Sequence, residues 1–259
     1  SSPIQTQSKS KCYLRHICWL KINHLKEMSS MPTTALIVGA GTGLSASIAR
    51  LFAQEGFKVA LAARQIDKLV QLSSEIGAVS FATDATQPNE VKQLFIDVDH
   101  KLGSPNVVVY NPSWRVRGPL IELDPGDVAK TLEVSAYGGF LVAHEAAKRM
   151  LQQGGGAIFF TGASASVKGY PQSAPFAMGK FALRGLAQSI ARELAPQNIH
   201  VAHFVIDGAI RSASRLDPAD NPDSTLDPDA IAQTYLNILR QPRSAWTWEV
   251  ELRPWVERF

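Results

Sequence analysis

The sequence has little cysteine and no long apolar run. Its two cysteines, Cys12 and Cys18, both lie in the first 30 residues, so residues 31–259 contain none. This excludes a disulfide framework and a thiolate metal site there, and a lack of disulfides suits a reducing compartment. No apolar stretch approaches the roughly 20 residues that a membrane helix needs. We therefore expect a cytoplasmic protein without a membrane span.

The charge of the chain is also small. The formal net charge is +3, but residues 1–30 hold five basic residues and one acidic residue, which leaves the remainder at −1. A nearly neutral body gives no electrostatic reason to expect a nucleic-acid partner. His200 and His203 lie in a strand pattern at a spacing that points them to opposite faces, so no metal site is expected.

The first 30 residues differ in composition from the rest of the chain. They are rich in Ser and Lys, poor in acidic residues, and carry a loose helical stripe of apolar residues. Two interpretations remain open: a transit peptide, which would make the location organellar, or an upstream or artificial extension ahead of Met31. On either interpretation we expect no fixed structure there, and a single domain over residues 31–259.

From Met31 onward, strand and helix patterns alternate. Uninterrupted apolar strands alternating with amphipathic helices predict an α/β, three-layer Rossmann fold, with a parallel seven-stranded sheet and helices on both faces. Strands are expected at Ala35–Val38, Phe57–Ala62, Ala78–Ala82, Asn106–Tyr110, Ala157–Thr161, Ile199–Val205 and Thr247–Leu252. Helices are expected at Leu44–Gln54, Ile66–Ile76, Val91–Leu102, Val128–Leu151, Ser173–Leu194 and Ala230–Leu239.

A glycine-rich turn, Gly39–Ser45, links the first strand to the first helix. Free N–H groups and the positive end of a helix meet at such a turn, which suits a pyrophosphate. The spacing is Gly-x-x-x-Gly-x-Ser rather than Gly-x-Gly-x-x-Gly, because Leu44 stands at the last glycine position of the general motif. Ser45 is expected to crowd either the helix–strand contact or the cofactor.

The spacing of this turn resembles that of the short-chain dehydrogenase/reductase family, Gly-x-x-x-Gly-x-Gly, with Ser45 in place of the third glycine. The resemblance extends over Thr33–Leu252 and implies a nicotinamide cofactor and a carbonyl or alcohol substrate. It also implies that Asp84 contacts the adenine. The cofactor-binding residues that turn chemistry and resemblance together suggest are Gly39, Gly41, Thr42, Gly43, Leu44, Arg64, Asp84, Asn111, Lys180, Gly208 and Ser212.

Arg64 favours NADP(H) over NAD(H). The second strand ends in Ala62-Ala63-Arg64, without the acidic residue that would bind the 2′-hydroxyl of NAD and repel a 2′-phosphate. An arginine can instead pair with that phosphate.

The catalytic residues that the resemblance implies are largely replaced. Lys180 is present, but Phe176 stands in place of the family's proton-transferring tyrosine, Ala163 in place of its serine, and Ser135 in place of its asparagine. Phenylalanine cannot transfer a proton. We expect Lys180, Ser164 and Ser135 to carry what catalysis remains. Ser164 would polarise the carbonyl after a shift of one residue, and a water held by Lys180 would donate the proton. The alternative is that the serines are ordinary structural positions.

Three functions therefore remain open. The first is an NADP(H)-dependent oxidoreductase with a modified proton relay. The second is a catalytically impaired nucleotide-binding or regulatory protein, and the third, without positive support, is a lyase or isomerase. The two long helices predict a homodimer or homotetramer, as in the family. Residues 211–229 are expected to form a mobile lid or a plain surface loop. The substrate is not identified.

Overall fold

The computed structural model describes residues 33–257. The expectations for residues 1–30 lie outside the described residues. Within residues 33–257, no helix is both long and apolar enough to cross a membrane.

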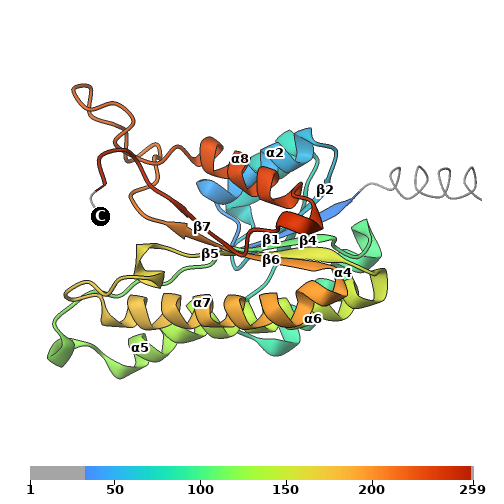
Figure 1. The fold of residues 1–259 in the computed structure, drawn as a ribbon, viewed down its shortest axis with the longest axis horizontal. Helices are drawn as coiled ribbons and strands as arrows, with labels where there is room; N and C mark the ends of the chain where they lie inside the picture. Colours follow the sequence, from blue (N-terminus) through green and yellow to red (C-terminus); the bar gives the residue numbers. More distant parts are fainter. Residues whose placement is uncertain (1–32, 258–259) are drawn as a thin grey trace, which may run out of the picture. The chain divides into compact units, whose positions relative to one another are not determined.

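A seven-stranded sheet forms the middle layer of the domain (Figure 1). Every neighbouring pair of strands is parallel, in the order β3-β2-β1-β4-β5-β6-β7. The predicted fold class is confirmed, and the strand positions agree to within two residues at each end. The strands are β1 (Thr34–Val38), β2 (Lys58–Ala63), β3 (Val79–Ala82), β4 (Val107–Tyr110), β5 (Gly156–Thr161), β6 (Ile199–Ile206) and β7 (Glu249–Leu252).

Helices cover both faces of this sheet (Figure 1). One apolar core contains side chains of α2, α3 and α8, and the other contains side chains of α4, α6 and α7. Alternate residues of the central strands enter the two cores, as the side-chain alternation of a strand requires. The helices are α2 (Leu44–Gln54), α3 (Val70–Ile76), α4 (Pro88–Leu102), α5 (Pro125–Leu132), α6 (Gly138–Gln153), α7 (Ala174–Leu194) and α8 (Pro228–Leu239).

The prediction of one regular helix over Val128–Leu151 was wrong in detail. A π-helical segment, Glu133–Tyr137, separates α5 from α6. The Tyr110 hydroxyl donates a hydrogen bond of 2.6 Å to the Val134 carbonyl inside this segment. A side chain at Gly138 would come within 2.4 Å of that hydroxyl. The π-helical segment therefore lies where the chain contacts Tyr110 of β4. Turns of this kind are frequent at functional sites.

The strand order reverses direction between β1 and β4. The chain moves outward from β1 through β2 to β3, and then returns to β4 on the other side of β1. The loops that leave the carboxyl ends of β1 and β4 therefore diverge and leave a crevice, where ligands bind in open α/β sheets. The glycine turn follows β1 and Asn111 follows β4, so both lie at this switch point.

The loop between β6 and α8 is held together by its own acidic residues. Asp217 accepts hydrogen bonds from the backbone N–H groups of Asp223 and Thr225 and from the Thr225 hydroxyl. Arg211 forms ion pairs with Asp217 and Asp227. The segment predicted to be a mobile lid or a plain surface loop is thus an internally bonded unit, and its first residues line a cavity described below.

Candidate functional site

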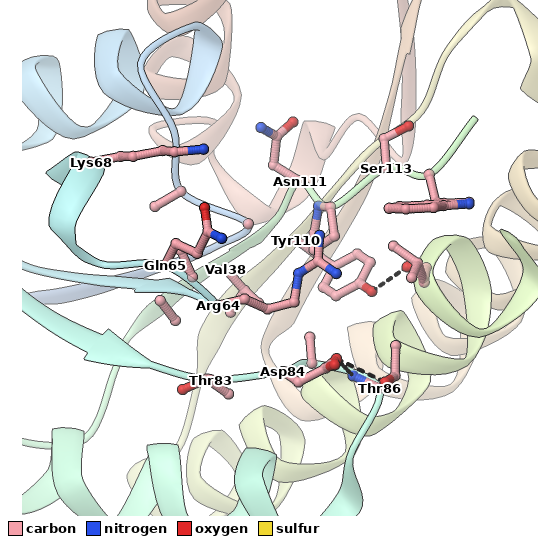
Figure 2. A pocket seen from close by; sticks show the side chains of 18 residues that line it. Val38, Arg64, Gln65, Lys68, Thr83, Asp84, Thr86, Tyr110, Asn111 and Ser113 are labelled. Carbon is pink, nitrogen blue, oxygen red and sulfur yellow. Dashed lines mark hydrogen bonds between the residues drawn. The ribbon is translucent and has the colours of Figure 1, made fainter. Parts of the chain in front are cut away.

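Two cavities open at the switch point of the sheet, one on either side of Asn111. The first has a volume of about 890 Å³ and lies over the ends of β1, β2 and β4, as Figure 2 shows. The second has a volume of about 730 Å³ and lies over the ends of β5 and β6. Asn111 and Ser113 line both cavities. Together the cavities form a site with two halves, as an elongated ligand requires.

Gly39 begins the turn in a conformation that a larger residue could not adopt. Its φ angle is +79°, and an added Cβ would lie 2.5 Å from the Pro112 nitrogen. By contrast, an added Cβ at Gly41 or Gly43 would meet nothing within 4 Å. No side chain caps the first turn of α2. The turn is therefore tight at its base and open at its tip, and the uncapped helix end fits a pyrophosphate.

Ser45, at the position of the family's third glycine, is turned into the protein. Its hydroxyl donates to the Gly39 carbonyl at 3.0 Å and accepts from Asn111 Nδ2 at 2.6 Å. It is buried and lines neither cavity. Of the two places that the sequence suggested for this side chain, the helix–strand contact and the cofactor site, the serine lies in the first.

Positive side chains lie along one side of the first cavity. Figure 2 shows Arg64 reaching into the cavity from the end of β2, with Lys68 on the following turn. The Arg64 guanidinium lies 5.8 Å from the centre of the Trp114 ring. Arginine and lysine here provide two cations for a phosphate group at the cavity's edge.

Asp84 lies at the end of β3 in the same cavity. Its carboxylate accepts hydrogen bonds from the Thr86 backbone N–H at 2.9 Å and from the Thr86 hydroxyl at 2.7 Å, as drawn in Figure 2. Burial alone would raise the pKa of Asp84, but these bonds and the charges of Lys130 and Arg64 outweigh it and lower that pKa. The carboxylate is fixed in its charged form at the cavity wall.

Lys180 is the buried cation of the second cavity. Its side chain projects from α7, and Nζ donates to the Thr161 carbonyl at 2.9 Å. The residue is 2% exposed, and burial lowers the pKa of Lys180 to about 8. An amine with a pKa near the working pH can both hold a proton and release one.

Phe176 lies one helical turn before Lys180 and lines the same cavity. Its ring centre is 5.9 Å from Lys180 Nζ and 5.1 Å from the guanidinium carbon of Arg115. The π face of the ring attracts both cations, but the ring has no exchangeable proton. The resemblance in sequence assigns Phe176 to the position of the family's proton-transferring tyrosine, which remains a prediction.

The serines expected near the reaction centre differ in their placement. Ser164 is half-buried and lines the second cavity beside Ala163. Ser135 lies in the π-helical segment, lines neither cavity, and packs against Gly179, where an added Cβ would come within 2.7 Å of the Ser135 Cβ. The Ser135 hydroxyl is buried and has no hydrogen-bond partner among the described residues.

The remaining expected cofactor residues fall in three groups. Gly39 lines the first cavity, and Gly43, Leu44, Gly208 and Ser212 line the second. Gly41 and Thr42, at the open tip of the turn, line neither. Residues 33–257 contain no cluster of His, Cys, Asp and Glu side chains suited to a metal ion.

The sequence prediction missed several basic residues of the site. Lys68 follows Arg64 by four residues, but Arg64 lies in the bend after β2 and Lys68 in the short 3-10 turn Asp67–Leu69, so no helical spacing links the two side chains. Arg115, Arg117 and Arg215 line the second cavity from two loops. No local pattern marks these three arginines, since only the fold brings the loops together.

The strand order and the turn at the switch point define a doubly wound dinucleotide-binding domain. The sequence model of the short chain dehydrogenase family matches residues 33–216. The chain belongs to the short-chain dehydrogenase/reductase family, a family of oxidoreductases that bind NAD(P).

Individual relatives agree with this assignment. The chain is 33% identical to a short-chain dehydrogenase/reductase from Armillaria gallica, over 68% of this chain and 70% of the relative. It is 26% identical to carbonyl reductase family member 4 from Xenopus tropicalis, over 82% and 93% of the two chains. Among solved structures, a short-chain dehydrogenase from Rhodopseudomonas palustris is 38% identical with a TM-score of 0.75, covering 86% of this chain and 99% of that one. A metagenomic short-chain oxidoreductase solved in complex with NADP is 25% identical with a TM-score of 0.75, covering 86% and 97%.

Proposed function

We propose that this protein is an NADP(H)-dependent carbonyl reductase or alcohol dehydrogenase with an atypical proton relay. The observation that carries the proposal is the division of charge across the two cavities. Arg64 and Lys68 lie in one half, the buried Lys180 lies in the other, and Asn111 borders both. The related metagenomic enzyme was solved with NADP, which supports the choice of cofactor.

The residues present fit such a cofactor. Gly39 provides the tight base of the turn, and the uncapped start of α2 would hold the pyrophosphate. Arg64 and Lys68 would bind the 2′-phosphate, and Asp84 would contact the adenine. The bound cofactor supplies a hydride for the substrate carbonyl carbon, or accepts one in the reverse direction.

The chain's own residues must then deliver one proton to the substrate oxygen. Hydride addition leaves a negative oxygen, which needs a positioned donor. Ser164 would donate a hydrogen bond to the carbonyl oxygen, and the Lys180 ammonium would deliver a proton to that oxygen through a bound water. Phe176 takes no part in this transfer and would exclude water from one side of the substrate.

Nucleotide titration followed by turnover assays tests the proposal. Trp114 lies beside Arg64, so saturable quenching of tryptophan fluorescence by NADPH, with weaker binding of NADH, is the expected result. Wild-type protein should then oxidise NADPH in the presence of a panel of aldehydes and ketones, and Lys180→Ala should abolish this activity. Lys148→Ala is the matched control, because Lys148 is an exposed helix lysine paired with Glu145. No saturable response to either nucleotide would refute the proposal.

The second candidate, a nucleotide-binding regulatory protein, is favoured by one feature of the sequence: the resemblance assigns Phe176 to the proton-donor position. It predicts that NADPH binds normally but is not consumed with any carbonyl compound, and that Phe176→Tyr is needed before turnover appears. The same binding and turnover measurements separate the two functions.

A homodimer or homotetramer through α6 and α7 belongs to the same proposal. Large apolar side chains remain 44–49% exposed on this side of the domain, a pattern that marks interaction surfaces. They are Tyr137, Phe140, Met178 and Phe181. Light scattering at micromolar concentration should give at least the mass of a dimer, and a monomer would contradict this part of the proposal.

A further inference from the structure

Basic side chains outnumber acidic ones around the second cavity. Five basic residues and two acidic residues line it. The basic residues are Arg115, Arg117, Lys180, Arg211 and Arg215, and the acidic residues are Asp207 and Glu257.

Part of this charge is already neutralised. Arg211 forms ion pairs with Asp217 and Asp227 in its own loop. Asp207 forms ion pairs with Lys168 at 2.9 Å and with Arg253 at 3.7 Å. Lys180 Nζ donates a hydrogen bond to the Thr161 backbone carbonyl, and both residues line this cavity.

Three arginines remain without a carboxylate partner among residues 33–257: Arg115, Arg117 and Arg215. The first two come from the loop after β4 and the third from the loop after β6. Burial first, and then the positive charges of Arg117 and Arg215, lower the pKa of Arg115, so these two charges act on Arg115. Arginine nevertheless stays protonated at neutral pH. Holding like charges together is unfavourable, and a bound anion would relieve it.

The position of Arg115 relates this charge to the reaction centre. Its guanidinium lies over the Phe176 ring at 5.1 Å from the ring centre, and Phe176 borders Lys180. A group bound by Arg115 would therefore share the cavity with a carbonyl that Lys180 could protonate. Planar guanidinium groups form paired hydrogen bonds with carboxylates and phosphates, which lysine cannot match.

We propose that the substrate carries a carboxylate or phosphate group beside its reactive carbonyl, and that Arg115, Arg117 and Arg215 recognise this anionic group. The inference rests on the proposed function for the chemistry at the carbonyl, but the anion site itself is a property of the three arginines. The cofactor's 2′-phosphate does not account for them, because Arg64 and Lys68 line the other cavity. The cofactor's pyrophosphate would lie at the start of α2, which borders the same cavity as the arginines, so binding of the anionic probes at saturating NADPH distinguishes a substrate anion from the pyrophosphate.

Matched probe compounds test this proposal directly. The neutral probe is 4-methylbenzaldehyde, and the anionic probes are 4-carboxybenzaldehyde and 4-formylphenyl phosphate. Binding of each is measured by calorimetry on the full chain, with and without saturating NADPH, and turnover is followed by NADPH absorbance. The variants are Arg115→Gln and the triple change Arg115→Gln, Arg117→Gln, Arg215→Gln. Arg192→Gln is the control, since Arg192 is an exposed arginine on α7 that bonds only a backbone carbonyl.

At least one anionic probe should bind or react at least about tenfold better than the neutral probe, since a hydrogen bond to a charged group contributes on this scale. The triple variant should lose that preference, Arg192→Gln should keep it, and rising salt should weaken it. The better of the two anionic probes identifies carboxylate or phosphate as the recognised group.

Equal values for neutral and anionic probes, including no detectable binding of any, overturn the inference. So does a preference that survives in the triple variant. If NADPH binds and the neutral aldehyde is reduced equally well, the anion site fails while the proposed function stands. If NADPH does not bind but the preference for an anionic probe depends on the three arginines, the proposed function fails while the anion site stands.

Discussion

Asn111 donates its side-chain amide to the hydroxyl of Ser45 at 2.6 Å, which joins the loop after β4 to the first turn of α2. The same hydroxyl donates to the Gly39 carbonyl, so one serine connects both sides of the crevice. Ser45, which replaces the third glycine expected from the family's motif, thus stabilises the turn Gly39–Ser45 through these two hydrogen bonds.

Ser45→Ala is expected to destabilise the protein by about 1 kcal/mol, because the half-buried Asn111 amide loses its acceptor. Chemical denaturation measures this change. Ser47→Ala is the matched control, since Ser47 is buried in the same helix and its hydroxyl forms no hydrogen bond within the described residues. Equal stabilities for the two variants would show that the Asn111–Ser45 bond contributes little.

Arg64→Asp is expected to reverse the cofactor preference. The substitution removes a cation from the first cavity and introduces a carboxylate that repels a 2′-phosphate and can accept a bond from a 2′-hydroxyl. NADPH should bind at least about tenfold more weakly, as expected for the loss of a charge-assisted bond, while NADH binding is retained or improved. Fluorescence titration with both nucleotides measures the ratio. Arg192→Asp should leave it unchanged, and an unaltered ratio in Arg64→Asp would remove Arg64 from the cofactor site.

Phe176→Tyr is expected to raise the rate of carbonyl reduction about 100-fold, a typical contribution from a positioned general acid. The new hydroxyl would extend from a ring that already lies near Lys180 and Arg115, and both cations would favour loss of its proton. Single-turnover rates at saturating NADPH provide the measurement. Phe181→Tyr, at an exposed ring on the same helix, should change nothing. If Phe176→Tyr is no faster, the proton donor of this enzyme does not depend on that position.

The β-α alternation could be recognised from the sequence, since it is a local pattern; the cofactor turn and the replacement of the family's tyrosine by Phe176 are local predictions of the same kind. The π-helical segment could not, because it accompanies a contact between Tyr110 and Val134 from separate elements. The arginines of the second cavity were missed for the same reason. Arg115 and Arg215 are ordinary loop residues in the sequence, and they share a cavity only because β4 and β6 end at one edge of the sheet.

The rate of carbonyl reduction is expected to fall as the pH rises through about 8. Burial lowers the pKa of Lys180 to about 8, so the ammonium that supplies the proton is lost above that pH, well below the ordinary range of lysine. Oxidation of the alcohol should show the opposite trend, because it needs the neutral amine. Rates of both reactions between pH 6 and 10 measure the effect. In Lys180→Arg, which stays protonated throughout, any residual reduction should not decline near pH 8; the same decline there would assign it to another group.

Acid is expected to destabilise the fold through His203. This side chain is fully buried on β6, and burial lowers the pKa of His203 to about 4 in spite of the nearby Glu249 carboxylate. The unfolded chain has an ordinary histidine pKa, so between pH 6.5 and pH 4 the unfolded state binds a proton that the folded state does not. The free energy of unfolding therefore falls as the pH falls through this window, by at most about 3 kcal/mol from this residue.

Denaturant titrations at several pH values, compared between wild type and His203→Gln, isolate this contribution from that of the carboxylates. The variant should lose less stability than wild type between pH 6.5 and pH 4. His144→Gln is the control, because the His144 side chain is 52% exposed, and it should follow wild type. If His203→Gln loses stability as steeply as wild type, the buried imidazole is not the group that titrates.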